Sequence, residues 1–438
     1  MSTLRAYARG PVLTAPGPRS GVMLRSIGTI RKDPLSFLMQ MQREHGSLVQ
    51  FPVPTPASYF VADAADVRRV LIENARAYDK HTMQYRGLAA LTGEGLLTSD
   101  GEKWRDARRV VQPAFHHEAV AGMRESIIRA AESACERWLH GDVIDVESEM
   151  MRMSLQIVGT TLFGADLSAE AADLSHATLQ ALDAVVTRAQ RPWLNAFHIP
   201  SRSGRHLRQA LTELDTAVVN LVAHRLSQPT AAPDMLGMLM AAHGVEPGQR
   251  VPREVRDEIV TFIVAGHETV ASGLTWAWHL LMTHQDQYSL LHDAGDDVHV
   301  VARAVFEEVL RLYPPAWLIT RRSLQSDVLS GCGIPADALI IMSPWVVHRD
   351  PHWWPQPEKF VPQRFLESSD ARRLAYLPFG FGQRMCIGRD MALLEGAIAL
   401  ATISQRVKFT AVENRNVGQI ASVTLRPAAP IKAQVQRR

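Results

Sequence analysis

The segment FGFGQRMCIG (residues 379–388) holds one of only three cysteines in the 438-residue chain. After Cys386, apolar side chains recur at helical spacing, which places the cysteine at the N-terminus of a predicted helix. Free backbone N–H groups and the helix dipole favour a thiolate at that position. Three glycines around the cysteine lack a Cβ and let a flat group approach the backbone closely: Gly380, Gly382 and Gly388.

A thiolate in such a turn can act as a nucleophile, exchange disulfides or bind a metal. Disulfide exchange usually requires a second cysteine in a C-x-x-C pair, and this chain has none. A cysteine hydrolase or acyltransferase requires a histidine base, which the sequence positions of the 17 histidines do not specify. Ligation of haem iron requires closely approaching glycines, a cation for the propionates and a shielded sulfur. Arg384 and Phe379 supply a cation and an apolar cover beside Cys386.

A second segment whose residues could take part in catalysis is VPREVRDEIVTFIVAGHETVASGLTWAWHLLMTH (251–284). It reads as one helix that starts near Pro252 and is apolar on nearly every side over 259–281, as a helix through the core would be. Its middle, AGHET, places Glu268 and Thr269 in that core. A glycine and a threonine hydroxyl can loosen the helical hydrogen bonds and open a small polar notch. An acid beside an alcohol can deliver protons to a group bound there.

The elements that must position these segments are mainly helical, with a minor β portion. Runs at 47–53 and 58–63 read as strands, 64–75 as a helix, and 102–325 as mostly amphipathic helices with breaks at 189–204 and 227–234. Short apolar runs among Pro, Gly and Asp follow over 324–366, and a short β-like run lies at 421–427. Residues 1–25 read as an irregular arm, and no linker divides the chain into separate domains.

Composition narrows the class of protein. Apolar residues make up 46% of the chain and charged residues 21%, and the formal net charge is +2, so no basic field implies nucleic acid. Three cysteines fit a reducing compartment, which predicts a cytoplasmic protein. The longest apolar runs fall far short of the roughly 20 residues that a membrane span needs. The expectation is a protein with no transmembrane anchor.

The cysteine segment resembles the haem-thiolate signature F-x-x-G-x-R-x-C-x-G of the cytochromes P450, filled here by Phe379, Gly382, Arg384, Cys386 and Gly388. The resemblance implies the P450 fold, in which a long central helix crosses the haem and small sheets lie at the periphery. It implies a bacterial-type monooxygenase that uses haem b and O2, with Cys386 as the iron ligand. Glu268 and Thr269 would manage the protons, and Ala265 and Gly266 would line the haem. Residues 1–438 would form one haem domain without a fused reductase.

Further contacts follow from the same resemblance. Helix 301–315 carries Glu308 and Arg311, which with Arg364 resemble the family's buried structural Glu–Arg pair; Gln363 stands where the family usually has glutamate. The haem propionates would be bound by Trp104 and Arg108, by Arg321 in preference to Arg322, and by His81.

The resemblance also predicts the pocket and the partners. The substrate-facing positions are mostly apolar and favour a hydrophobic terpenoid, fatty-acyl, carotenoid or polyketide-like substrate: Met83, Leu91, Leu96, Leu97, Phe262, Ala265, Ala316, Trp317, Ile319 and Val423. Electrons would come from a separate ferredoxin or flavodoxin with its NAD(P)H reductase, docking near Arg105, Arg109 and Arg389. Three alternatives stay open: a peroxide-using or isomerising haem-thiolate enzyme, a cysteine hydrolase or acyltransferase, and a non-catalytic haem or lipid carrier.

Overall fold

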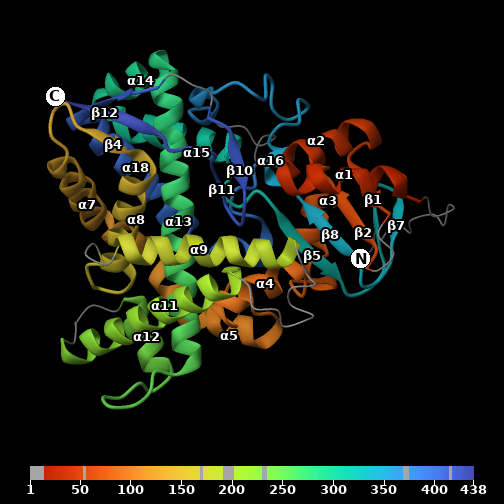
Figure 1. Cartoon of the computed structure of the whole chain (residues 1–438), viewed down its shortest axis with the longest axis horizontal. Helices are drawn as coiled ribbons and strands as arrows, with labels where there is room; N and C mark the ends of the chain where they lie inside the picture. The colour runs from red at the N-terminus through yellow and green to blue at the C-terminus, as the bar shows by residue number, and fades with distance from the viewer. Residues whose placement is uncertain are drawn as a thin grey trace, which may run out of the picture.

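The computed structural model describes residues 14–52, 56–167, 171–190, 202–228, 234–367, 374–413 and 417–438. In these residues, helices form most of one side of the molecule, and the largest sheet with its helices forms the other (Figure 1). The mainly α fold with small sheets is therefore confirmed. Most of the two segments predicted as helix breaks, 191–201 and 229–233, lies outside the described residues.

Helices α1 to α12 precede the long central helix. The expectation of an irregular arm over residues 1–25 is wrong for its last part, because α1 begins at Ser20 and its residues Met23 and Ile30 pack against the neighbouring core. Residues 1–13 lie outside the described residues. The bounds are α1 Ser20–Lys32, α2 Pro34–His45, α3 Ala64–Arg68, α4 Met83–Thr92, α5 Gly101–Val111, α6 His117–Gly122, α7 Arg124–Arg137, α8 Val146–Leu162, α9 Ala171–Gln190, α11 Arg202–Ser227 and α12 Met235–Ala242.

The second half begins with the central helix and ends in strands. The predicted helix at 64–75 continues from α3 into a π-helical turn, Arg69–Glu73. The later helices are α13 Arg253–Thr283, α14 Gln285–His292, α15 Val298–Leu312, α16 Pro344–Val347 and α18 Arg389–Arg406. Helix α15 ends just before Pro314 and Pro315, as the sequence predicts, because proline cannot continue the hydrogen-bond ladder.

The strands form four small sheets. The largest has the order β1-β2-β8-β5-β3, in which β2 and β8 are parallel and the other neighbours are antiparallel. A second sheet has the order β4-β12-β9, and the pairs β10-β11 and β6-β7 are separate. The bounds are β1 Leu48–Phe51, β2 Ser58–Val61, β3 Tyr78–Asp79, β4 Val143–Asp145, β5 Ile319–Ser323, β6 Asp327–Leu329, β7 Cys332–Ile334, β8 Leu339–Met342, β9 Val407–Ala411, β10 Gln419–Ala421, β11 Leu425–Pro427 and β12 Lys432–Arg437.

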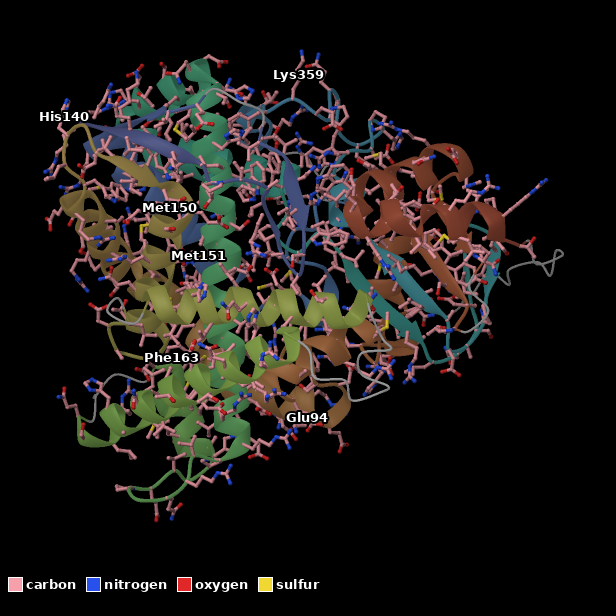
Figure 2. All side chains as sticks on the ribbon, in the orientation of Figure 1. Glu94, His140, Met150, Met151, Phe163 and Lys359 are labelled. Carbon is pink, nitrogen blue, oxygen red and sulfur yellow. The ribbon has the colours of Figure 1, made fainter. Side chains whose placement is uncertain are left out.

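Helix α13 runs through the middle of the molecule and packs against α8, α15 and α18 (Figure 1). Its residues are buried on almost all sides, and the ring of Trp276 stacks on Tyr313 with the ring centroids 3.9 Å apart. On α8, Met150 and Met151 are buried and lie beside α13 (Figure 2). Flexible thioether side chains suit such an irregular helix contact. None of the helices that the structure describes is long and apolar enough to cross a bilayer.

A buried carboxyl lies between α18 and α8. Glu395 is fully buried and accepts a hydrogen bond from the Ser154 hydroxyl at 2.7 Å, and burial raises the pKa of Glu395 to about 8. In the unfolded chain its pKa returns to about 4.5. Between these two values the folded protein binds more protons than the unfolded chain, so the free energy of unfolding falls as pH rises.

Replacing Glu395 with glutamine is expected to flatten this pH dependence, because the amide has the shape of the protonated acid and does not ionise. Relative to Glu395→Gln, the wild type should lose about 1.4 kcal/mol of stability per pH unit within that window. Urea unfolding at a series of pH values measures the difference. Parallel stability curves for the two proteins would contradict the assignment of a neutral Glu395.

Candidate active site

The cysteine turn is held by backbone hydrogen bonds. The Cys386 amide donates to the Phe379 carbonyl at 2.9 Å, and the Met385 amide donates to the Gly382 carbonyl at 3.0 Å. Gly380 and Gly382 have φ values of 67° and 70°, which favour glycine. A Cβ on Gly382 would lie 2.1 Å from the Leu71 carbonyl oxygen, so the backbone there packs too closely for any side chain.

The sequence favours a thiolate at Cys386, at the N-terminus of a helix, but the protein groups around Cys386 do not favour the ionised form. Helix α18 begins at Arg389, three residues after Cys386, with Gly388 as its N-cap. The Cys386 side chain is accessible to solvent, yet the surrounding protein desolvates it and raises the pKa of the thiol. The Gly388 amide and the Arg108 guanidinium act in the opposite direction but do not outweigh desolvation.

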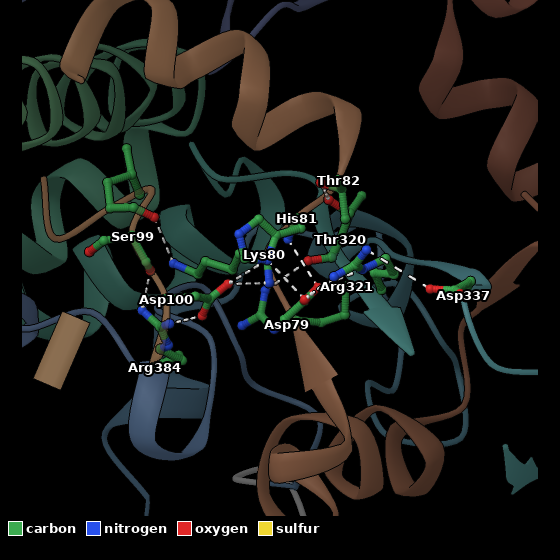
Figure 3. A network of polar contacts seen from close by, with 12 residues as sticks. Asp79, Lys80, His81, Thr82, Ser99, Asp100, Thr320, Arg321, Asp337 and Arg384 are labelled. Atoms are coloured by element: carbon green, nitrogen blue, oxygen red, sulfur yellow. Dashed lines mark hydrogen bonds and ion pairs between the residues drawn. The ribbon is translucent and has the colours of Figure 1, made fainter. Parts of the chain in front are cut away.

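A cavity of about 540 Å³ lies near this turn and is lined by cationic side chains from five parts of the chain. They are Arg76 in the 3-10 turn Ala75–Ala77, Lys80 and His81 before α4, Arg105 on α5, Arg321 on β5 and Arg384 in the cysteine turn. Figure 3 shows Lys80, His81, Arg321 and Arg384 gathered around Asp79 and Asp100.

The anionic partners within this cluster are already engaged. Arg384 pairs with Asp100 and donates to the Ser99 carbonyl at 2.9 Å (Figure 3). Its guanidinium also lies 3.9 Å from the centroid of the Trp104 ring. Asp79 pairs with Arg322 at 2.5 Å and with His81 at 2.9 Å. The choice of Arg321 over Arg322 agrees with this geometry, because Arg321 is buried at the cavity whereas Arg322 is committed to Asp79.

The sequence reasoning missed Lys80. It is buried, and its ammonium donates to the Leu97 carbonyl at 2.9 Å. Burial lowers the pKa of Lys80 well below its usual value, and Arg321, Arg384 and Arg108 lower it further. Its position next to His81 in the sequence YDKHT was the only available signal. The cavity lining has more cations than carboxylates, so it suits an anionic guest.

Trp104 and Arg108 lie one helical turn apart on α5, as their spacing predicts. Trp104 is buried under Arg384, and Arg108 donates to the Met385 carbonyl at 3.1 Å, next to Cys386. Burial lowers the pKa of Arg108, while Cys386 raises it. Both side chains therefore contact the cysteine turn directly.

Helix α13 reaches the same region at its middle. Ala265, Gly266 and Thr269 are only partly buried, although the residues around them on α13 are buried. The helix continues without a break here, contrary to the expected loosening, and the Thr269 hydroxyl donates to the Ala265 carbonyl at 2.8 Å. Gly266 allows α8 to approach, since a Cβ there would lie 3.0 Å from the Val158 side chain.

Glu268 is buried beside the strand pair β10-β11. Its carboxylate accepts a hydrogen bond from the Thr424 hydroxyl at 2.5 Å and lies 3.9 Å from Arg426 Nε. Burial raises the pKa of Glu268 to about 7, against the lowering effects of Thr424 and Arg426. Sequence reasoning missed both partners, because nothing in the residues 424–426 marks a contact 156 positions away.

An aromatic contact connects the cysteine turn to α13. A Cβ on Gly388 would lie 3.8 Å from the ring of Phe115, and that ring stacks on Phe262 of α13 with centroids 5.5 Å apart.

A sequence model of the family described as cytochrome P450 matches residues 13–435.

The chain belongs to the cytochrome P450 family.

Relatives of this P450 agree with that assignment. It is 32% identical to cyclooctatin synthase and 30% identical to cyclooctat-9-en-7-ol 5-monooxygenase, both from Streptomyces melanosporofaciens, over 92% of this chain and 91% of each relative. The crystal structure of CYP175A1 from Thermus thermophilus superimposes with a TM-score of 0.80 at 32% identity, covering 97% of this chain and 100% of that one.

Family membership decides several of the predictions. The resemblance stated from the cysteine segment is confirmed, and the protein is an oxidoreductase of a family that binds haem b and uses O2. This excludes the cysteine hydrolase or acyltransferase. The residues present suit haem, because the cation-rich cavity offers donors for two propionates beside an accessible cysteine sulfur.

The structural triad of this P450 comes together in the core. Glu308 and Arg311 are fully buried and form two hydrogen bonds of 2.7 and 2.8 Å, and Arg364 Nε lies 3.4 Å from Glu308. The remaining Arg311 donors bind the carbonyls of His348, Pro357 and Lys359. The pair therefore fastens α15 to the segment 348–364.

The predicted substrate positions divide into three groups. Leu97, Ala265, Ile319 and Val423 are partly buried. The fully packed core positions are Leu91, Leu96, Phe262 and Trp317, and the Trp317 indole donates to the Ser422 carbonyl at 2.8 Å. Met83 and Ala316 are exposed on the surface. Sequence position alone does not separate these cases, because all three environments accept apolar side chains.

Proposed function

We propose that this P450 is a monooxygenase in which the Cys386 sulfur binds the iron of haem b and a hydrophobic terpenoid is hydroxylated. The main support is the juxtaposition of the accessible Cys386 turn with the surplus of cations around the 540 Å³ cavity, of which Lys80 and Arg321 are buried. Bound haem supplies O2 activation and the oxidising power for insertion of one oxygen atom into a C–H bond.

The protein's own residues bind and orient the cofactor. Lys80, Arg108, Arg321 and His81 would supply donors for the propionates. Gly380 and Gly388 would leave room for the ring beside the turn, whereas Gly382 packs against the Leu71 backbone. Cys386 would hold the iron as a thiolate although burial raises the pKa of its thiol, because a thiol coordinated to a metal is deprotonated. Arg384 keeps the turn in place through Asp100 and Trp104.

Two residues on α13 hold and move protons. Glu268 has a pKa of about 7, so it can both carry and release a proton at neutral pH. The Thr269 hydroxyl, which donates to the Ala265 carbonyl, stands on the partly buried side of the helix and passes the proton on. Peroxide-using and isomerising members typically lack such an acid–alcohol pair, and its presence here favours O2-dependent turnover.

Replacing Thr269 with alanine is expected to uncouple electron consumption from product formation. The alcohol that holds the proton near the reacting centre is lost, so product per electron pair should fall by about tenfold or more, within the range for proton-transfer groups. Product and NAD(P)H consumption are measured together with a surrogate ferredoxin system. Thr269→Ser keeps the hydroxyl and should retain most of the coupling; unchanged coupling in Thr269→Ala would contradict the proton role.

Electrons are proposed to arrive from a separate ferredoxin or flavodoxin with its NAD(P)H reductase. Arg105, Arg109 and Arg389 are exposed near the cysteine turn, so they can meet an acidic partner. Each has an acidic neighbour on its own helix: Glu102, Asp106 and Asp390 respectively. Exposed pairs of this kind contribute little, so the arginines can exchange partners on docking.

The substrate class is proposed from the apolar lining and from the relatives. Phe262, Ile319 and Val423 offer no charge to a ligand, and one relative is named for oxidation of the cyclic alcohol cyclooctat-9-en-7-ol. The experiment that tests the function is a titration of the haem-loaded protein with cyclic terpenes, terpene alcohols and fatty acids, read from the haem absorption spectrum. Hits are then tested for oxygenated product with O2 and electron donors. Spectral shifts confined to fatty acids would contradict the terpenoid assignment.

A further inference from the structure

Arg426 of β11 lies between two carboxylates that come from different helices. Its Nη2 donates to Asp183 Oδ1 of α9 at 2.8 Å, and its Nε lies 3.9 Å from Glu268 Oε1 of α13. The Arg426 side chain is 14% exposed, the Glu268 side chain 2% and the Asp183 side chain 58%. The guanidinium therefore connects the buried acid to a carboxylate at the surface.

The backbone that carries Arg426 is fixed to α13. The Leu425 carbonyl accepts hydrogen bonds from the Ser272 hydroxyl at 2.7 Å and from the Trp276 indole at 3.3 Å. On the other side, the Ser422 hydroxyl donates to Asp183 at 3.0 Å, so two side chains of this hairpin hold the same carboxylate. Arg426 is thus oriented by α13 through its backbone and by α9 through its side chain.

The charges around Glu268 oppose one another. Burial has the largest effect and raises the pKa of Glu268; Thr424 and Arg426 lower it, and the carboxylates of Asp183 and Glu147 raise it. Glu147 lies at the start of α8 and is itself influenced by Arg426. These groups come from α8, α9 and the β10-β11 hairpin, each of which contributes to the surroundings of the acid.

We propose that Arg426 is a positioning residue for proton delivery: held by Asp183, it places part of its charge beside Glu268 and so determines how readily that acid ionises. The inference rests on the proton role of Glu268 stated under Proposed function. An arginine paired with Glu268 alone would favour the ionised acid. Asp183 binds the same guanidinium, and its negative charge weakens the effect of Arg426 on Glu268. The contact between α9 and the hairpin thereby sets the protonation of an acid in the interior.

The test follows the Glu268 carboxyl directly in the haem-loaded ferric protein. Difference infrared spectroscopy reports protonated carboxyl groups, and subtraction of Glu268→Gln assigns the band to this residue. The titration midpoint should rise by roughly one pH unit or more in Arg426→Gln, because a cation next to the acid is lost. It should fall in Asp183→Asn, because the charge of Arg426 is no longer shared. Arg426→Lys, which keeps the charge, should return the midpoint towards the wild-type value.

Arg256 offers a matched control. It also joins α13 to another helix, through a 2.7 Å pair with Asp215 of α11, and its side chain is 19% exposed. Arg256→Gln also removes an arginine–aspartate pair, but Arg256 lies roughly 18 Å from Glu268 along α13, so the Glu268 midpoint should stay unchanged. A shift in this control equal to that of Arg426→Gln would overturn the assignment.

Opposite shifts in Arg426→Gln and Asp183→Asn support the proposal, since a general loss of packing would not move the two midpoints in opposite directions. Absence of either shift, or shifts in one direction, overturns it. The pH profile of product coupling should move with the midpoint in each variant. Wild-type coupling in Glu268→Gln would instead refute the proton role of Glu268. The titration shifts in the Arg426 and Asp183 variants would still test whether Arg426 controls the ionisation of Glu268.

Discussion

Replacing Cys386 with serine is expected to abolish the thiolate signature of the haem and nearly all oxygenase activity. Serine preserves the size of the side chain but offers a hydroxyl, which does not give iron the electron-rich sulfur ligand. Turnover should fall by at least about 10²-fold, the scale found for groups acting directly at a reacting centre. The measurement is the absorption of the reduced, carbon-monoxide-treated protein, which is strongly red-shifted when a thiolate is bound.

The other two cysteines are matched controls. Cys135 and Cys332 are buried, and burial raises the pKa of both thiols. Cys332→Ser should leave the red-shifted band in place, because Cys332 belongs to the sheet-side core rather than to the cation-lined cavity. A persistent red-shifted band in Cys386→Ser, or its loss in Cys332→Ser, would refute the assignment of the ligand.

Replacing Arg311 with methionine should destabilise the protein severely. Arg311 and Glu308 are both fully buried, and removal of the guanidinium leaves the Glu308 carboxylate and three backbone carbonyls short of donors. Breaking one side of a buried ion pair costs about 3–5 kcal/mol. That is a large share of the roughly 5–15 kcal/mol typical of folded proteins, so haem content and expression should fall as well. Urea unfolding measures the loss.

Arg303 provides the comparison on the same helix. It pairs with Glu307 at 3.5 Å with i, i+4 spacing, and its side chain is 54% exposed. Arg303→Met should cost less than about 1 kcal/mol, because exposed pairs are screened by water. Equal losses in Arg303→Met and Arg311→Met would show that the buried triad has no special structural role.

The proposed proton path depends on groups that lie far apart in the sequence. Glu268, Thr424, Arg426 and Asp183 come from three regions of the chain and meet where the β10-β11 hairpin packs against α13 and α9. Glu268 is buried and has a pKa of about 7, so its protonated and ionised forms are both present near neutral pH. Under this proposal, substitutions in the apolar lining should change which substrate is oxidised. Substitutions of Arg426 should change the proton supply instead.

Local sequence determined the elements and the chemistry of single segments. The prolines after Leu312, the apolar run of α13 and the glycines around Cys386 act on their own backbone or on adjacent turns, so their effect is readable without a structure. The signature from Phe379 to Gly388 can be recognised in the sequence for the same reason, because all its residues build one turn. The local pattern failed at the start of α18, which lies three residues after Cys386, and at α1, which begins inside the segment expected to be irregular.

Only the tertiary structure decided which distant groups share a site. Lys80 joins Arg321 and Arg384 around one cavity, and Arg426 reaches Glu268, although no periodicity links these positions. It also separated Leu91, Phe262 and Trp317, which are buried core residues, from Leu97 and Val423, which are only partly buried. The physical reason is that charge and burial depend on distance in space, whereas a sequence reports only distance along the chain.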